Sequence, residues 1–265
     1  IIRHRHDYEY VVFFLMHPIN ELFPLIVVKI LGKKGVKVPL SPSPKNSVRL
    51  PYVYAFFEHF VFKYMDYFIP EYISTTRYLN EGQLTLIRDK LLPPANFFML
   101  EGGYIKSTGL RDRRYDIGYI GGFRKIKGIK NFVEAISLIN AEVNGINCVI
   151  IGDGELKDEI SDLMVTPEYC NVNLMDWVPH HLLPEYLNQI KVLIIPSFSE
   201  SGPFIAIEAM ACGTIVVSTK VGVVPEIVIE GKNGYLLNSN SPRCISEKII
   251  SIIKTDYERL DQVSD

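Results

Sequence analysis

Two glutamates eight residues apart are the most informative side chains in this sequence. Glu200 and Glu208 lie in the run ESGPFIAIEAMACG at residues 200–213. Ionised carboxylates accept hydrogen bonds from the adjacent hydroxyl groups of a sugar. Glu208 also sits inside an otherwise apolar helical segment, where a buried carboxylate needs a polar partner. The pattern therefore favours a ligand-binding role for both residues over that of solvent-exposed charges.

The segment between the two glutamates predicts the start of a helix. Gly202 and Pro203 precede its apolar part, and proline suits a first helical turn because its missing N–H would have no partner there. The backbone N–H groups of Phe204 and Ile205 would then point out of the helix end, where the helix dipole also favours negative charge. A pyrophosphate is the kind of group that such an end binds.

A second candidate segment, YIGGFRKIKG at residues 119–128, predicts a strand that ends in Gly121 and Gly122. Glycines let a backbone approach a phosphate closely, and Arg124 and Lys127 can neutralise its charge. The spacing fits neither the GxGxxG fingerprint nor a P-loop. Taken alone, the segment is more typical of a solvated basic turn.

Two more polar segments follow predicted strands. VIIGDGE at residues 149–155 is compatible with a tight turn beside a ligand, with Gly154 at its end. NLMDWVPHHLLPEYL at residues 173–187 places Trp177 and Val178 after a strand. For the single tryptophan we expect core packing in preference to contact with a base.

The elements that must position these residues alternate between short buried strands and helices in the second part of the chain. Strands are predicted at residues 115–120, 147–151, 172–175, 192–196, 215–218 and 235–237. Helices are predicted at residues 129–139, 155–164, 182–188, 204–211, 225–230 and 241–253. This alternation indicates a parallel sheet wound by right-handed crossovers, which binds ligands at the carboxyl ends of its strands. The glycine-rich segments described above fall at such ends.

The first part of the chain has a less regular pattern. Strands are predicted at residues 10–16, 36–40, 68–74 and 96–100, and helices at residues 19–31, 52–67 and 76–91. Residues 102–114 are polar, rich in glycine and charge, and without apolar periodicity. The sequence therefore predicts two domains, at residues 1–108 and 109–265. The basic cluster at residues 111–114 is expected to be a solvated surface or linker.

Composition excludes several classes of protein. The 265 residues are 48% hydrophobic and carry a net charge of −2, which gives no reason to expect nucleic-acid binding. The four cysteines form no CxxC pair, so we expect reduced thiols and no metal site. No apolar run approaches the roughly 20 residues of a membrane-spanning helix, and the first residues do not form a signal peptide. A cytoplasmic protein is implied, with peripheral membrane contact left open.

The order of these segments resembles the donor-binding domain of the retaining glycosyltransferases of family 4, which have the GT-B fold. The resemblance covers residues 115–253, and its most specific part is Glu-x7-Glu followed by AMACG-x-x-VV. It implies two Rossmann-like domains with parallel sheets, the N-terminal one incomplete here. It also implies a nucleotide diphosphate sugar, UDP- or GDP-linked, as donor, and neither a cofactor nor a metal.

The resemblance assigns a role to each candidate residue. Glu200 would contact the hydroxyls of the donor sugar, and Glu208 would hold the nucleotide ribose. Lys127 would bind the donor phosphate, and the backbone of Val178 would meet the base. Arg124, two positions after the usual place of the family's arginine, is our own candidate to help Lys127 stabilise the leaving diphosphate. The remaining residues expected to bind the nucleotide sugar are Gly121, Gly122, Gly154, Gly202, Phe204 and Ile205.

The sequence also departs from the family pattern. The family often has arginine where Gly122 stands, and ESGPF replaces the commoner EGFGL. The usual cleft histidine of the first domain is not visible, and His17 is the only nearby candidate on the acceptor side. The first strand of the family and its glycine-rich acceptor loop are not visible either. The chain is therefore expected to be a fragment or a shortened relative.

These observations predict metal-independent transfer of a sugar, with retention of configuration, to a glycan, lipid or small molecule that the sequence does not identify. The alternatives are a binding protein of this fold that has lost turnover, and a sugar-nucleotide epimerase. A pyridoxal-dependent phosphorylase would need a Schiff-base lysine that we do not find. A dehydrogenase is disfavoured because no GxGxxG follows a strand. The oligomeric state is not indicated.

Overall fold

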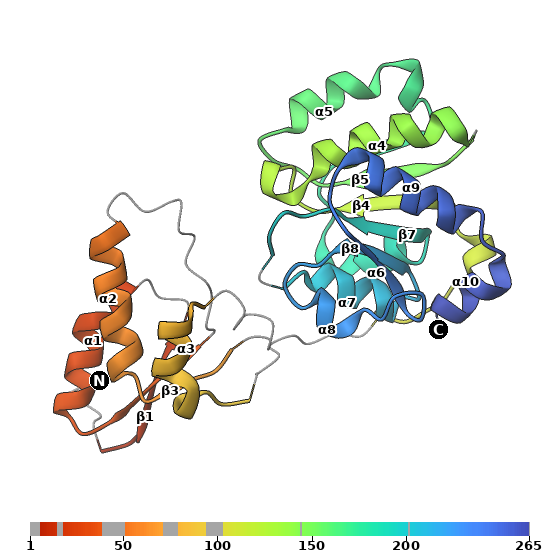
Figure 1. Cartoon of the computed structure of the whole chain (residues 1–265). Helices are drawn as coiled ribbons and strands as arrows, with labels where there is room; N and C mark the ends of the chain where they lie inside the picture. The colour runs from red at the N-terminus through yellow and green to blue at the C-terminus, as the bar shows by residue number, and fades with distance from the viewer. Residues whose placement is uncertain are drawn as a thin grey trace. The chain divides into compact units, whose positions relative to one another are not determined.

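The computed structural model describes residues 6–14, 18–38, 51–70, 79–93, 103–143, 145–200 and 202–264. The chain divides into two compact units, residues 1–97 and 98–265 (Figure 1). This division lies earlier in the chain than the predicted boundary at residue 108. None of the helices in the described ranges is long and apolar enough to cross a membrane.

The first unit contains a parallel sheet in the order β1-β2-β3 with helices packed against it. Its elements are β1 (Tyr10–Phe14), α1 (Pro18–Ile30), β2 (Lys34–Val38), α2 (Pro51–Tyr64), β3 (Tyr67–Phe68) and α3 (Glu81–Ile87). Side chains such as Phe13, Leu25 and Phe62 form its core. The predicted strand at residues 96–100 and the candidate His17 lie outside the described residues.

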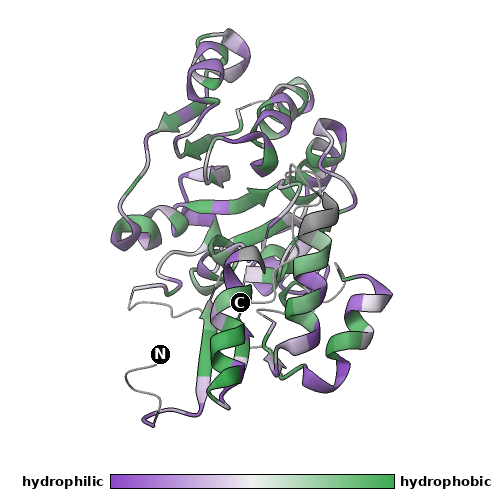
Figure 2. Cartoon of the chain, turned by 90° about the vertical axis from the view of Figure 1, so that its left-hand side faces the viewer, coloured by the Kyte–Doolittle hydropathy of each residue, from purple (hydrophilic) through white to green (hydrophobic). Residues whose placement is uncertain are grey.

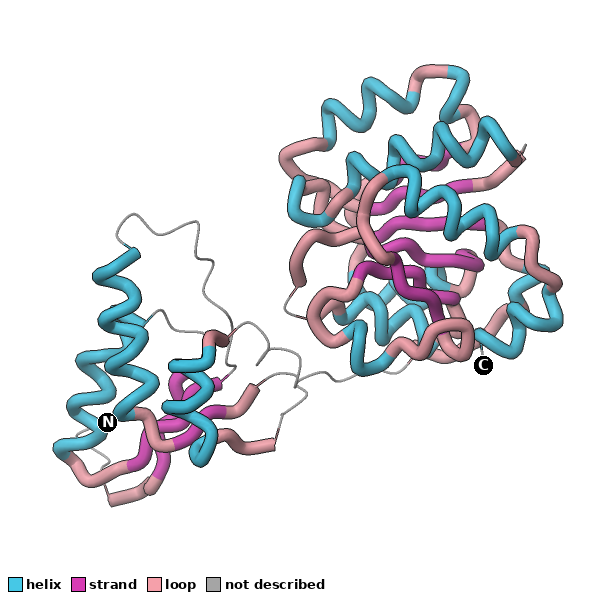
Figure 3. The backbone as a smooth tube through the Cα atoms, viewed as in Figure 1, coloured by secondary structure: helices cyan, strands magenta, loops and turns pink. Residues whose placement is uncertain are grey.

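The second unit contains a larger parallel sheet in the order β6-β5-β4-β7-β8-β9 (Figure 3). Its strands are β4 (Tyr115–Ile120), β5 (Cys148–Ile151), β6 (Val172–Met175), β7 (Ile190–Ile195), β8 (Ile215–Thr219) and β9 (Gly234–Leu237). Its helices are α4 (Ile129–Glu142), α5 (Lys157–Met164), α6 (Leu183–Leu187), α7 (Phe204–Ala211), α8 (Val224–Ile227), α9 (Pro242–Ile253) and α10 (Tyr257–Ser264). The predicted class, α/β with parallel sheets, is confirmed.

Both faces of this sheet are buried, because side chains of a strand alternate between faces. In β5, Cys148 and Ile150 belong to a cluster with residues of α4, α5, α9 and α10, whereas Val149 and Ile151 belong to a second cluster with residues of α6, α7 and α8. Hydrophobic residues accordingly run along the strands, while the helices mix hydrophobic and hydrophilic residues (Figure 2). Helix α10 was not predicted, because its sequence YERLDQVS buries little beyond Leu260 and Val263.

The segment that leads into β4 is fastened to the second unit by two buried polar side chains. Asn188 accepts a hydrogen bond from the backbone N–H of Ser107 at 2.7 Å and donates to the carbonyl of Ile105 at 2.9 Å. Arg113, only 4% exposed, belongs to this segment. Its guanidinium donates hydrogen bonds both to the segment and to more distant parts of the second unit. These hydrogen bonds tie the segment to the second unit, which explains why this compact unit starts before the predicted boundary at residue 108.

Arg113 is therefore not the surface residue that the basic cluster predicted; Arg111 and Arg114 are exposed as expected. The fixed fork of its guanidinium matches several acceptors that point at one place. Burial lowers the pKa of Arg113 to about 10, which leaves it protonated at neutral pH. The acceptors are the carbonyls of Thr108, Leu187, Ile190 and Cys212 and the hydroxyl of Thr214.

We expect Arg113→Lys to lower the free energy of unfolding of the full chain by about 3 kcal/mol, because an ammonium cannot reach all of these buried acceptors. Urea unfolding followed by circular dichroism measures the change. Arg243→Lys is the matched control, since the side chain of Arg243 is 86% exposed. Equal effects of the two substitutions would contradict this account of Arg113.

Candidate functional site

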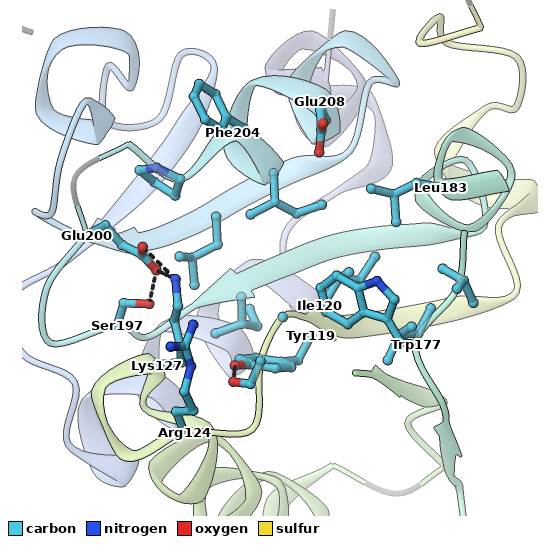
Figure 4. A pocket seen from close by; sticks show the side chains of 18 of the residues that line it. Tyr119, Ile120, Arg124, Lys127, Trp177, Leu183, Ser197, Glu200, Phe204 and Glu208 are labelled. Atoms are coloured by element: carbon cyan, nitrogen blue, oxygen red, sulfur yellow. Dashed lines mark hydrogen bonds and ion pairs between the residues drawn. The ribbon is translucent and has the colours of Figure 1, made fainter. Parts of the chain in front are cut away.

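A cavity of about 430 Å³ opens at the carboxyl ends of β4 and β7 in the second unit. These two strands are neighbours at the point where the strand order reverses, which is where sheets of this type bind ligands. The side chains around it come from the turns after β4, β6 and β7 and from α7 (Figure 4). Among its lining residues are the predicted Gly121, Gly122, Arg124, Lys127, Val178, Glu200, Gly202, Phe204, Ile205 and Glu208.

One predicted residue, Gly154, is not among the described residues that line this cavity. Gly154 lies behind the turn that follows β4, with a φ of 152°, and a Cβ there would approach the backbone nitrogen of Phe123 to 2.9 Å. Its absent side chain lets the two turns pack together. His17 lies outside the described residues.

One end of the cavity holds a charged pair. The Nζ atom of Lys127 lies 2.7 and 2.6 Å from the two carboxylate oxygens of Glu200. The hydroxyl of Ser197 donates to the same carboxylate at 2.7 Å. Arg124 lies beside Lys127 (Figure 4). The two candidate cations and the first of the two glutamates therefore share one end of the site.

The turn that carries Lys127 is pressed against the loop that carries Glu200. Gly128, which follows Lys127, has a φ of 70°, and a Cβ there would lie 2.1 Å from the carbonyl oxygen of Pro196. The backbone N–H of Phe198 donates to the carbonyl of Ile126 at 2.8 Å. Only glycine fits such an approach, so Gly128 sets the spacing between the two charges.

A tyrosine that sequence reasoning missed braces the glycine turn. The hydroxyl of the buried Tyr119 donates to the carbonyl of Gly122 at 2.9 Å. Burial, and next the negative charge of Glu200, raise the pKa of this hydroxyl, which keeps it protonated as a donor. The inward position of Tyr119 in β4 follows strand alternation, but the hydrogen bond depends on how the turn folds back.

Glu208 projects into the cavity from α7 (Figure 4) and is 8% exposed. Sequence reasoning expected a polar partner for it, and the structure supplies His180, whose Nε2 lies 2.8 Å from Oε1 of Glu208. His180 follows Val178 in the loop after β6 and was not among the predicted site residues. Its place near a strand end was the only available signal.

The opposite end of the cavity is apolar. The expectation of core packing for Trp177 is wrong, because this side chain is 62% exposed and lies on the cavity wall beside Ile120 (Figure 4). The chain leaves the sheet after Met175, so Trp177 lies beyond the packed layers. The cavity thus presents charge at one end, an aromatic and aliphatic surface at the other, and a carboxylate between them.

Comparison with known sequences places this site in a family. The family model described as glycosyl transferases group 1 matches residues 103–264. A glycosyltransferase of Methanocaldococcus jannaschii, named as uncharacterized, is 30% identical over 162 residues, which are 61% of this chain and 45% of that protein. The N-acetyl-alpha-D-glucosaminyl L-malate synthase of Bacillus anthracis is 26% identical, over 57% of this chain and 39% of that protein. The chain thus covers less than half the length of either relative.

Among solved structures, the Anabaena protein HepE in complex with UDP superposes with a TM-score of 0.79 at 16% identity. The superposition covers 99% of this chain and 73% of that one. HepE has also been solved in complex with UDP-glucose. At this identity the likeness concerns the fold, and it confirms the predicted GT-B architecture.

We expect Gly128→Ala to lower the free energy of unfolding by about 3 kcal/mol or more, because a methyl group must displace the backbone at Pro196. Gly145→Ala is the matched control, since Gly145 also has a positive φ but open space around it, and it is expected to cost about 1 kcal/mol. Urea unfolding of both variants measures the difference. A cost for Gly128→Ala no larger than that of the control would contradict the contact.

Proposed function

The chain belongs to the glycosyl transferases group 1 family, and from this premise we propose that it transfers a sugar from a nucleotide diphosphate sugar to an acceptor with retention of configuration. The observation that carries the proposal is that one cavity brings together two cations, two glutamates and an apolar end. In this proposal residues 98–265 form the donor domain and residues 1–97 belong to the acceptor side, so the division of the structure replaces the predicted boundary at residue 108. A cytoplasmic location, with membrane contact left open, is part of the same proposal.

The donor diphosphate is proposed to bind at the charged end of the cavity. Lys127 and Arg124 supply positive charge there, and the first turn of α7, at Phe204 and Ile205, adds the partial positive charge of a helix end. A glycine turn next to these groups lets the backbone approach the phosphates closely. This turn consists of Gly121 and Gly122, and Gly202 lies on the opposite loop.

The nucleoside is proposed to bind towards the other end. The base would lie by the backbone of Val178 and the exposed ring of Trp177, and Glu208 would accept hydrogen bonds from the ribose hydroxyls. UDP is the first nucleotide to test, because HepE binds UDP and UDP-glucose. GDP is the second.

Catalysis is proposed to rest on electrostatic stabilisation of the leaving diphosphate. Lys127 and Arg124 would neutralise the charge that develops as the bond to the sugar breaks. Glu200 would position the sugar through its hydroxyls. Lys127 and Glu200 hold each other in this structure, so donor binding would exchange that ion pair for contacts to phosphate and sugar. Because these two side chains would supply the positive charge that the leaving diphosphate needs, we propose a metal-independent reaction. His17 remains the acceptor-side candidate.

Binding of UDP and GDP to the full chain, measured by calorimetry, tests the donor site. Glu208→Ala is expected to weaken binding about 10- to 100-fold, the loss of hydrogen bonds to a charged acceptor. Glu185→Ala, an exposed glutamate on α6, is the control and should leave affinity unchanged. If the unmutated protein binds neither nucleotide, the proposal is wrong.

Turnover is tested with UDP-glucose and GDP-mannose by following sugar release to water or to added acceptors, with the anomer identified by NMR. We expect a retained anomer and no loss of rate with EDTA. Lys127→Ala should lower the rate about 100-fold, whereas Lys125→Ala, an exposed lysine of the same turn, should not. Inversion or EDTA sensitivity would refute the mechanism. Binding without turnover would favour the non-catalytic alternative, and isomerised donor would favour the epimerase.

A further inference from the structure

We propose that His180 and Tyr104 are positioning residues that orient the carboxylate of Glu208 towards the hydroxyls of a bound ribose. The inference rests on the proposed donor-binding function and adds two residues to it. It arises from a chain of contacts that runs from the segment before β4, through the loop after β6, to α7.

The contacts are short and continuous. The hydroxyl oxygen of Tyr104 lies 2.9 Å from Nε2 of His180 and 3.3 Å from the His180 carbonyl oxygen. The same Nε2 atom lies 2.8 Å from Oε1 of Glu208. The rings of Tyr104 and His180 pack with their centroids 5.6 Å apart. His180 is thus held on two sides, by an aromatic ring and by a carboxylate.

Hydrogen-bond chemistry determines where the protons lie. An ionised carboxylate only accepts, so Nε2 of His180 must carry a hydrogen and donate it to Glu208. Tyr104 cannot then donate to the same nitrogen, and its hydroxyl hydrogen is left for the carbonyl oxygen of His180. The phenol therefore fixes the backbone of the loop, and the imidazole fixes the carboxylate.

Glu208 needs such a partner because its side chain can otherwise rotate. Among the described residues, only the side chain of His180 forms a hydrogen bond or an ion pair with the carboxylate of Glu208. One oxygen is committed to His180, which leaves the other to accept from a ribose. At the other end of the cavity, Lys127 and Glu200 form an ion pair with each other.

The two positioning residues differ in how firmly they are held. Tyr104 is buried and lies in the segment that Asn188 fastens through Ile105 and Ser107. The side chain of His180 is 56% exposed. Replacement of His180 should therefore leave the fold intact and act only through Glu208, which allows the inference to be tested by binding.

The test measures the affinity of the full chain for UDP and GDP and for their 2′,3′-dideoxy counterparts. His180→Ala is expected to weaken binding of the ribonucleotide about 5- to 10-fold. Binding of the dideoxynucleotide should change less than about twofold, because it lacks the hydroxyls that Glu208 would hold. Tyr104→Phe, which keeps the ring, should give a smaller loss of the same kind.

Two further variants separate positioning from a general structural effect. In a Glu208→Ala background, which removes the acceptor, His180→Ala should have no additional effect, because the two residues would act as a unit. His180→Gln should recover most of the affinity, since its amide can donate to the carboxylate. His181→Ala, an exposed histidine next in sequence, is the matched control and should bind normally.

The outcomes distinguish this inference from the proposed function. If the unmutated protein binds neither nucleotide, the proposed function and the inference both fall. If it binds a ribonucleotide in a manner that depends on Glu208, the inference alone is overturned by normal binding of His180→Ala. Equal losses for the ribonucleotide and the dideoxynucleotide would also overturn it, as would the same loss from His180→Ala in the Glu208→Ala background.

Discussion

The reversal of strand order between β4 and β7 is the constraint on which the arrangement of the site depends. The helix after β4 packs on one face of the sheet, through residues such as Phe132, and the helix after β7 packs on the other, through Ala206 and Ala209. The segments that follow these two neighbouring strands must therefore leave the carboxyl edge of the sheet towards opposite faces, and a crevice opens between them. Lys127, Arg124 and Glu200 lie on the two turns that border this crevice, and Glu208 faces it from α7.

One close approach between backbone segments then determines which charges face the crevice. Gly128 lets the turn after β4 lie against Pro196, which brings Lys127 and Glu200 together. An ion pair that is partly exposed stabilises a protein only modestly. Such a pair keeps the two charges near each other when no ligand is bound. A ligand can readily replace this ion pair with its own contacts to the two side chains. The crevice is thus preorganised for a charged group, while Lys127 and Glu200 neutralise each other when no ligand is bound.

The sequence predicted the strands, helices and glycine turns of the second unit well, because period-two and period-3.6 patterns are local properties. Strand β4 and helix α7 have the predicted bounds, and the residues at strand ends gather around one cavity. Properties that depend on distant contacts were not predictable. Tyr104 and His180 are 76 positions apart, and Arg113 is distinguished from its exposed basic neighbours only by carbonyl groups far along the chain.

The segment that carries Tyr104 also joins the two compact units of the chain, and this has a thermodynamic consequence. If the phenol helps to hold Glu208 for a ribose, occupancy of the ribose site must in return favour the contacts between Tyr104 and His180 by the same free energy. Reciprocity of this kind holds for any two coupled equilibria, whatever the path between them. A bound nucleotide would then strengthen the contacts that Tyr104 and His180 make within the second unit.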